Sequence, residues 1–200
     1  MRFDIKLKWP ISCYAGILVI LLYCIFTFTS IALFPPPFSA LDNWLSDLGN
    51  SSYNPNGAIL YNLGCILTGI ILFPFFIGLI KWYTDEFWYK NFIRIIQCIG
   101  CFSGFALIMI GIYSEDFIAP HVFWSEVFFN VNLTVLMLSS LTLYFHPDFI
   151  KWISIYGIIV AVINLLFVFF LGTPILEWFT VFSALGYVGL IVFNMYQKFR

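Results

Sequence analysis

Six long apolar stretches divide this chain, and each is long enough to cross a lipid bilayer as a helix. A bilayer-spanning helix needs about 20 consecutive, mainly apolar residues. The stretches that meet this requirement cover about residues 11–34, 57–82, 92–113, 121–145, 149–171 and 175–196. The composition agrees, because 62% of the residues are hydrophobic and only 10% are charged, whereas about a quarter of the residues in a soluble chain are charged. We therefore expect an all-α, six-helix transmembrane bundle that forms a single integral membrane domain over residues 1–200.

The connection between the first two spans is polar and begins with three consecutive prolines. Proline cannot continue a helix, so these residues end the first span. Within the connection, Leu41, Trp44, Leu45 and Leu48 recur at helical spacing. An apolar stripe of this kind predicts a short interfacial helix between spans 1 and 2.

All nine lysine and arginine residues lie in the segments that six spans place on one side of the membrane. They are Arg2, Lys6, Lys8, Lys81, Lys90, Arg94, Lys151, Lys198 and Arg200. By the positive-inside rule this side is cytoplasmic. We therefore expect a multi-pass protein of the cell membrane with both termini in the cytoplasm (N-in, C-in). The net charge of −1 offers no basic patch, so we expect membrane lipids and no nucleic acid as partners; the oligomeric state stays open.

The opposite side of the membrane collects the polar residues that could do chemistry. Asp47 lies in the polar connection, Asn62 lies early in the second span, and Glu115 follows the third span. His121 and Glu126 lie in the first turns of the fourth span. Ionisable side chains inside a bilayer are costly, so they normally face the interior of a bundle and find partners there. We therefore expect these five residues to converge on one extracytoplasmic polar pocket.

Eight residues form the predicted site. Asp47 and His121 are the expected catalytic residues, because a carboxylate and an imidazole can act as acid–base partners. The residues expected to bind or orient a ligand are Ser46, Asn62, Glu115, Asp116, Ser125 and Glu126. His121 and Ser125 are four residues apart and share a helix face, so with an acid they formally make a nucleophile triad.

Two alternatives to acid–base chemistry stay open at this point. The carboxylates and the imidazole could ligate a divalent metal ion, although no strong metal-ligand motif is present and the cofactor is unknown. Only two histidines exist, and His146 is expected on the other side, which argues against a three-histidine zinc site. In a purely structural interpretation, Ser46 or Asp47 caps a helix and Asn62 joins two helices.

Three classes of function follow from this arrangement. The leading hypothesis is lipid or head-group handling at the outer leaflet, either by hydrolysis or by remodelling. The second is a proton- or cation-linked transporter or sensor, which would need a polar path to the cytoplasm. The inner halves of the spans offer little for such a path beyond Gln97, Ser139, Ser140 and Ser154. The third is a non-catalytic membrane scaffold, so the sequence leaves open whether the protein is an enzyme.

The order of several short motifs resembles the prokaryotic domain-of-unknown-function 998 (DUF998) family. The motifs are residues 46–49 (SDLG), 61–62 (YN), 111–116 (GIYSED) and His121. The resemblance covers nearly the whole chain and implies about six spans. The chain departs from the family pattern at Tyr61, where the family has Phe, and at residues 113–114, where Phe-Pro is usual. More faintly, the Ser-Asp-x-Gly turn is similar to one in the Frag, DRAM and Sfk membrane proteins, some of which remodel GPI lipid anchors.

Overall fold

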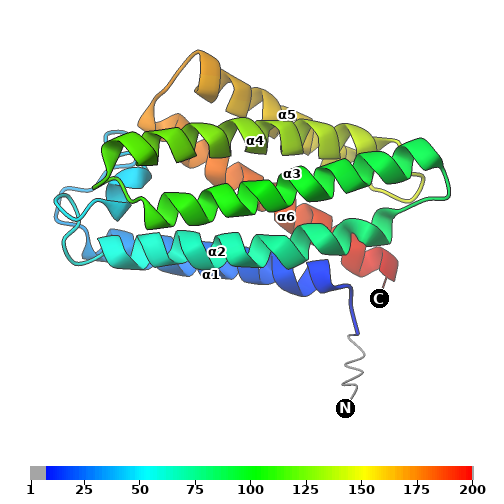
Figure 1. Ribbon diagram of the computed structural model, residues 1–200, viewed down its shortest axis with the longest axis horizontal. Coiled ribbons are helices and arrows are strands. Elements are labelled where there is room, and N and C mark those ends of the chain that lie inside the picture. The colour runs from blue at the N-terminus through cyan, green and yellow to red at the C-terminus, as the bar shows by residue number, and fades with distance from the viewer. Residues whose placement is uncertain (1–7, 200) are drawn as a thin grey trace.

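The computed structural model describes residues 8–199, which form a bundle of six helices (Figure 1). The helices are α1 (Ile11–Leu33), α2 (Ala58–Ile77), α3 (Phe87–Ile112), α4 (Ile118–Tyr144), α5 (Lys151–Phe169) and α6 (Pro174–Phe199). Each is long and apolar enough to cross a membrane, α2 together with the 3-10 helix η2 (Gly78–Trp82) that continues it. No strand occurs in the described part of the chain. The expected all-α, six-helix fold is confirmed.

Consecutive helices pack against one another, and α6 closes the bundle by packing against α1. Glycines allow a close approach between α2 and α3. A Cβ atom on Gly69 would lie 2.6 Å from the carbonyl oxygen of Gly104, and one on Gly104 would lie 2.8 Å from the carbonyl oxygen of Gly69. Small residues at such crossings are typical of membrane helices, because packing between close backbones replaces the hydrophobic effect there.

Some helix boundaries differ from the sequence-based expectation. Helix α3 begins at Phe87, five residues before the predicted span, and α6 continues three residues past its predicted end to Phe199. Basic residues lie in both extensions; their long side chains can reach water from a helix that extends beyond the bilayer core. The predicted interfacial helix is only a 3-10 turn, η1 (Ser46–Gly49). Asp47 accepts a hydrogen bond from the backbone N–H of Trp44, and such local bonds compete with a longer α-helix.

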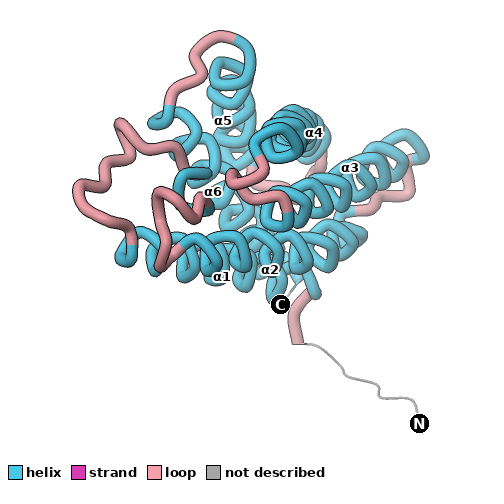
Figure 2. Tube along the Cα trace, turned by 60° about the vertical axis from the view of Figure 1, so that its left-hand side comes forward, coloured by secondary structure: helices cyan, strands magenta, loops and turns pink. Residues whose placement is uncertain are grey.

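The two ends of the bundle differ in charge. One end, here called the basic end, holds both termini of the described chain (Figure 1) and every lysine and arginine among residues 8–199. The other, the acidic end, holds the three connections α1–α2, α3–α4 and α5–α6. Figure 2 shows the long α1–α2 connection folded over this end. That the basic end is cytoplasmic stays a prediction from the positive-inside rule.

Candidate functional site

The α1–α2 connection is held against the bundle by Asn54, whose side chain is fully buried. Its Nδ2 donates hydrogen bonds to Ser30 Oγ (2.8 Å) and to the carbonyl oxygen of Leu48 (3.0 Å). Its Oδ1 accepts a hydrogen bond from the backbone N–H of Gly57 at 3.1 Å, just before α2 begins. One asparagine therefore joins the end of α1, the turn η1 and the start of α2.

The turn η1 is also held from two neighbouring helices. Asn62, on α2, donates a hydrogen bond from Nδ2 to the carbonyl oxygen of Gly49 at 2.9 Å. Glu177, on α6, accepts one at Oε2 from the backbone N–H of Leu45 at 2.7 Å. A Cβ atom on Gly49 would lie only 2.4 Å from Asn62 Oδ1, so a larger residue there would have to displace the Asn62 side chain. Asn62 thus joins α2 to the turn η1, whereas the structural interpretation of the sequence had it joining two helices.

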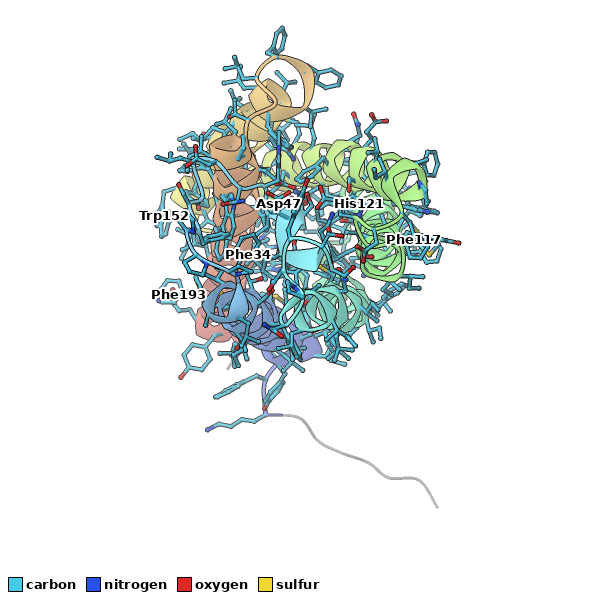
Figure 3. All side chains as sticks on the ribbon, turned by 90° about the vertical axis from the view of Figure 1, so that its left-hand side faces the viewer. Phe34, Asp47, Phe117, His121, Trp152 and Phe193 are labelled. Carbon is cyan, nitrogen blue, oxygen red and sulfur yellow. The ribbon has the colours of Figure 1, made fainter. Side chains whose placement is uncertain are left out.

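Asp47 is buried, with 6% of its surface exposed, and its carboxylate points back onto its own turn. Oδ2 accepts hydrogen bonds from the backbone N–H of Trp44 (2.9 Å) and from Asn43 Nδ2 (3.3 Å). Asp47 lines a cavity of about 680 Å³, here called the turn cavity, whose wall also includes Ser52 and Glu115. Figure 3, which looks onto the acidic end, shows Asp47 near its centre, on the turn.

Asp116 ties the α3–α4 connection to the α1–α2 connection. Its Oδ1 accepts hydrogen bonds from the backbone N–H and the hydroxyl of Ser51, at 2.9 and 2.8 Å, and its Oδ2 accepts one from Ser114 Oγ at 3.0 Å. Burial raises the pKa of Asp116, but these hydrogen bonds outweigh that effect and lower the pKa below its usual value. Asp116 therefore acts as an ionised clamp between two loops.

A second cavity, of about 490 Å³, lies between α4 and the C-terminal part of α5; we call it the α4–α5 cavity. Figure 1 shows α5 leaning away from its neighbours toward this end of the bundle. The polar side chains in its wall include Ser46, Glu115, His121, Ser125, Glu126, Asn130 and Glu177. Its apolar wall includes Phe129, Phe167 and Val168. Five of the eight predicted site residues thus share one cavity, whereas Asp47, Asn62 and Asp116 lie outside it.

His121 is the central polar residue of the α4–α5 cavity and is 6% exposed. Its Nδ1 lies 2.8 Å from the carbonyl oxygen of Tyr113. A carbonyl can only accept a hydrogen bond, so Nδ1 carries the proton and Nε2 of the neutral ring does not. Nε2 lies 3.4 Å from Ser125 Oγ, a long contact that leaves the nitrogen able to accept a proton from a ligand. This is the geometry of a general base.

Glu115 lines both cavities, because it lies in the connection between α3 and α4. Burial and the nearby Asp47 carboxylate raise its pKa to about 7, against a smaller lowering by a hydrogen bond from Asn50. Its Oε2 is buried and has no hydrogen-bond partner among residues 8–199. A carboxyl group with a pKa near neutrality can either donate or accept a proton.

Glu126 is exposed although it lies well inside α4. It follows Ile118 by eight residues, which places it about 12 Å along the helix at 1.5 Å per residue. Asn130, one turn further, is also exposed and donates a hydrogen bond to the carbonyl oxygen of Glu126 at 2.8 Å. No lysine or arginine of the described chain lies at this end, so Glu126 has no counter-ion there. Such a residue normally faces water or a polar ligand.

Among the described residues, no three His, Cys, Asp or Glu side chains are placed to hold a metal together. His146, the other histidine, lies at the basic end, where its ring packs 5.0 Å from Trp82 and 5.5 Å from Tyr89 between centroids. The α4–α5 cavity therefore offers a single imidazole, that of His121.

Glu177 is not among the residues that the sequence predicted for the site. This glutamate is 7% exposed, lines the α4–α5 cavity and holds Leu45 from 132 residues away. The sequence does show an acidic residue in the first turn of the sixth span, and this feature could have indicated a site residue. Only the closure of the bundle, which packs α6 against α1, explains why it meets the turn.

A family model described as "Protein of unknown function (DUF998)" matches residues 17–194. The match covers all six helices at least in part and includes every residue of the predicted site. No curated protein and no solved structure matches the chain. The fainter similarity to the Frag, DRAM and Sfk proteins stays a prediction from the sequence.

Proposed function

This chain belongs to the DUF998 family of multi-pass membrane proteins of unknown function, and we propose that it binds and modifies lipid head groups at the outer leaflet. The observation that carries the proposal is the α4–α5 cavity, whose wall combines polar side chains with the apolar side chains of Phe129, Phe167 and Val168. A lipid likewise combines a polar head group with an apolar chain. The cavity lies beside α4 and α5, helices that bilayer lipids surround.

The charges of the cavity favour a particular kind of head group. Three carboxyl side chains line it, those of Glu115, Glu126 and Glu177, and no lysine or arginine of the described chain is near to balance them. A bare phosphate would lack a cationic partner in this cavity and would be repelled by each carboxyl group that is ionised. Amino and hydroxyl groups would instead find acceptors. We therefore assign the site to head groups that expose an amine or a sugar.

The proposed reaction is hydrolysis by acid–base catalysis. Nε2 of His121 takes a proton from a water molecule as the water oxygen bonds to the scissile centre of the head group. Protonated Glu115, whose pKa lies at about 7, gives its proton to the oxygen of the leaving group as the old bond breaks. Return of one proton from His121 to Glu115 restores both residues. In this scheme Asp47 acts through Glu115, whose pKa it raises, instead of pairing directly with His121.

The test uses the purified protein in lipid nanodiscs that contain phosphatidylethanolamine, phosphatidylglycerol and a glycosyl diacylglycerol. Mass spectrometry follows the lipids over time. We expect the wild-type protein to convert the amine- or sugar-bearing lipid and to leave phosphatidylglycerol unchanged. The variant His121→Gln should slow conversion by about 100-fold or more, the usual contribution of a general base.

Two further variants separate binding from chemistry. Glu126→Gln should weaken retention of the preferred lipid through purification, because it removes a head-group acceptor from the cavity wall. Glu86→Gln is the matched control, since Glu86 is exposed at the basic end, and it should behave as wild type. Identical lipid composition and no conversion with the wild-type protein and all variants would contradict the proposed function.

A further inference from the structure

Two smaller cavities continue inward from the α4–α5 cavity. The first, of about 30 Å³, has His121, Ser125 and Phe129 in its wall, as the α4–α5 cavity does; we call it the neck. The second, of about 90 Å³, shares Tyr23 and Phe128 with the neck; we call it the axial cavity. Because each cavity shares wall residues with the next, the three follow one another from the acidic end into the bundle.

The wall of the axial cavity is mainly aliphatic and aromatic. Val19, Leu72, Leu107, Val135 and Val188 contribute to it from α1, α2, α3, α4 and α6. Along α6 it extends from Val181 to Ile191, which is about 15 Å at 1.5 Å per residue. The cavity is therefore elongated along the bundle axis and lies at the depth of the bilayer interior.

Most of the hydroxyl groups that reach this cavity already have protein partners. Ser139 Oγ lies 3.3 Å from Tyr187 Oη, and Tyr23 Oη lies 3.3 Å from Tyr61 Oη at the neck. Thr68 Oγ1 is fully buried and has no partner within residues 8–199. A buried water usually makes about three hydrogen bonds to protein groups. A space with this wall suits a hydrocarbon better than it suits a column of water.

We propose that the neck and the axial cavity hold one hydrocarbon chain of a membrane lipid, with the chain inserted between the helices instead of remaining in the bilayer. The inference rests on the proposed function, because the lipid is the one whose head group occupies the α4–α5 cavity. The neck, at about 30 Å³, is much smaller than the α4–α5 cavity of about 490 Å³, so we expect the head group to stay in the larger cavity. His121 and Ser125, which line both the α4–α5 cavity and the neck, would lie at the junction of head group and chain.

The experiment uses a lysophosphatidylethanolamine whose hexadecanoyl chain carries a photoactivatable diazirine. The full-length protein in nanodiscs is irradiated with this probe, and crosslinked residues are located by mass spectrometry. We expect crosslinks at residues of the axial cavity such as Leu72, Val135 and Val188. Crosslinks confined to exposed, bilayer-facing residues such as Leu18 and Ile155 would overturn the inference.

Two variants test the cavity itself. Ala184→Phe fills the axial cavity, whose wall includes Ala184, and should abolish the interior crosslinks. Ala32→Phe makes the same change at an exposed position of α1 and should leave them unchanged. Leu79→Ala opens space at the end of the cavity nearest the basic end, so crosslinks should move toward that end. This third variant tests the same inference if Ala184→Phe fails to fold.

The inference and the proposed function fail separately. Interior crosslinks combined with no effect of His121→Gln on head-group chemistry would support the inference and reject the proposed reaction. Head-group conversion that depends on His121, combined with crosslinks only on bilayer-facing residues, would reject the inference and leave the proposed function standing.

Discussion

Glu115 connects the two groups of polar residues at the acidic end of the bundle. It is the acidic residue that lines both the turn cavity, which it shares with Asp47, and the α4–α5 cavity, which it shares with His121. Its Oε2 is the buried carboxyl oxygen that has no hydrogen-bond partner among the described residues. A change of charge in either cavity should therefore change the pKa of Glu115.

The first prediction concerns stability and pH. Folding raises the pKa of Glu115 from 4.5 to about 7, so between these pH values the folded protein holds a proton that the unfolded chain releases. The contribution of Glu115 to the free energy of unfolding is therefore most favourable below about pH 4.5. It falls as the pH rises toward about 7 and is constant above that. The variant Glu115→Gln should lose this part of the pH dependence.

Thermal unfolding of the protein in nanodiscs at several pH values between about 5 and 8 measures the effect. The unfolding temperature of Glu115→Gln should increase relative to that of the wild-type protein as the pH rises through this range. Glu86→Gln serves as the control and should follow the wild type. A constant difference between wild type and Glu115→Gln at every pH would contradict the raised pKa.

Helical spacing explains why three of the predicted residues line the α4–α5 cavity together. His121, Ser125 and Glu126 lie within the first three turns of α4, where helical periodicity determines which side chains share a face. Asp47 and Asp116 lie in loops, and there the direction of a carboxylate depends on the backbone N–H and hydroxyl groups that the fold places beside it. The donor to Asp47 is the backbone N–H of Trp44, and the donors to Asp116 are the backbone N–H and the hydroxyl of Ser51. The spacing of residues in the sequence does not predict these contacts.

At the scale of elements, α2 and α3 approach each other closely where Gly69 crosses Gly104. Gly69 and Gly104 each place a carbonyl oxygen where the other would carry a Cβ atom. The obstacle is backbone on both sides, so neither helix can relieve a clash by rotating a side chain. This crossing therefore fixes the distance between α2, which carries Asn62, and α3, which leads into Glu115.

The second prediction follows from this geometry. Gly69→Ala and Gly104→Ala should each destabilise the folded protein by about 1–3 kcal/mol, the usual cost of overpacking a close contact. Gly172→Ala is the matched control, because a Cβ atom there meets nothing within 4 Å. Thermal or denaturant unfolding in detergent compares the three variants with the wild type. Equal destabilisation by all three substitutions would contradict the close backbone contact between Gly69 and Gly104.

The spans themselves were predictable, because length and hydropathy alone determine them. The start of α3 at Phe87 and the reduction of the interfacial helix to the turn η1 were not. Both depend on local competition between polar side chains and the backbone or water. The packing of α6 against α1, which brings Glu177 to Leu45, could not be deduced from hydropathy, since six apolar spans are compatible with several arrangements.

At the scale of the whole molecule, charge and cavities follow the same axis. The lysines and arginines of the described chain lie at the basic end, whereas the turn cavity and the α4–α5 cavity, with their acidic side chains, lie at the acidic end. Between them the interior is the mainly apolar axial cavity. Proton- or cation-linked transport needs a polar route through the molecule. The axial cavity, whose wall is mainly apolar, offers few polar groups for such a route. Chemistry confined to one leaflet is the better match.

The central claim is that the acidic end, with its polar cavities, faces the outside of the cell. Ser52→Cys and Glu126→Cys place a thiol in the walls of the turn cavity and the α4–α5 cavity, and Glu86→Cys places one at the basic end. A membrane-impermeant maleimide is added to intact cells, and the wild-type chain sets the background from its own five cysteines. We predict that positions 52 and 126 react from outside and that position 86 reacts only after the membrane is permeabilised. Reaction of position 86 in intact cells, with positions 52 and 126 protected, would contradict the account.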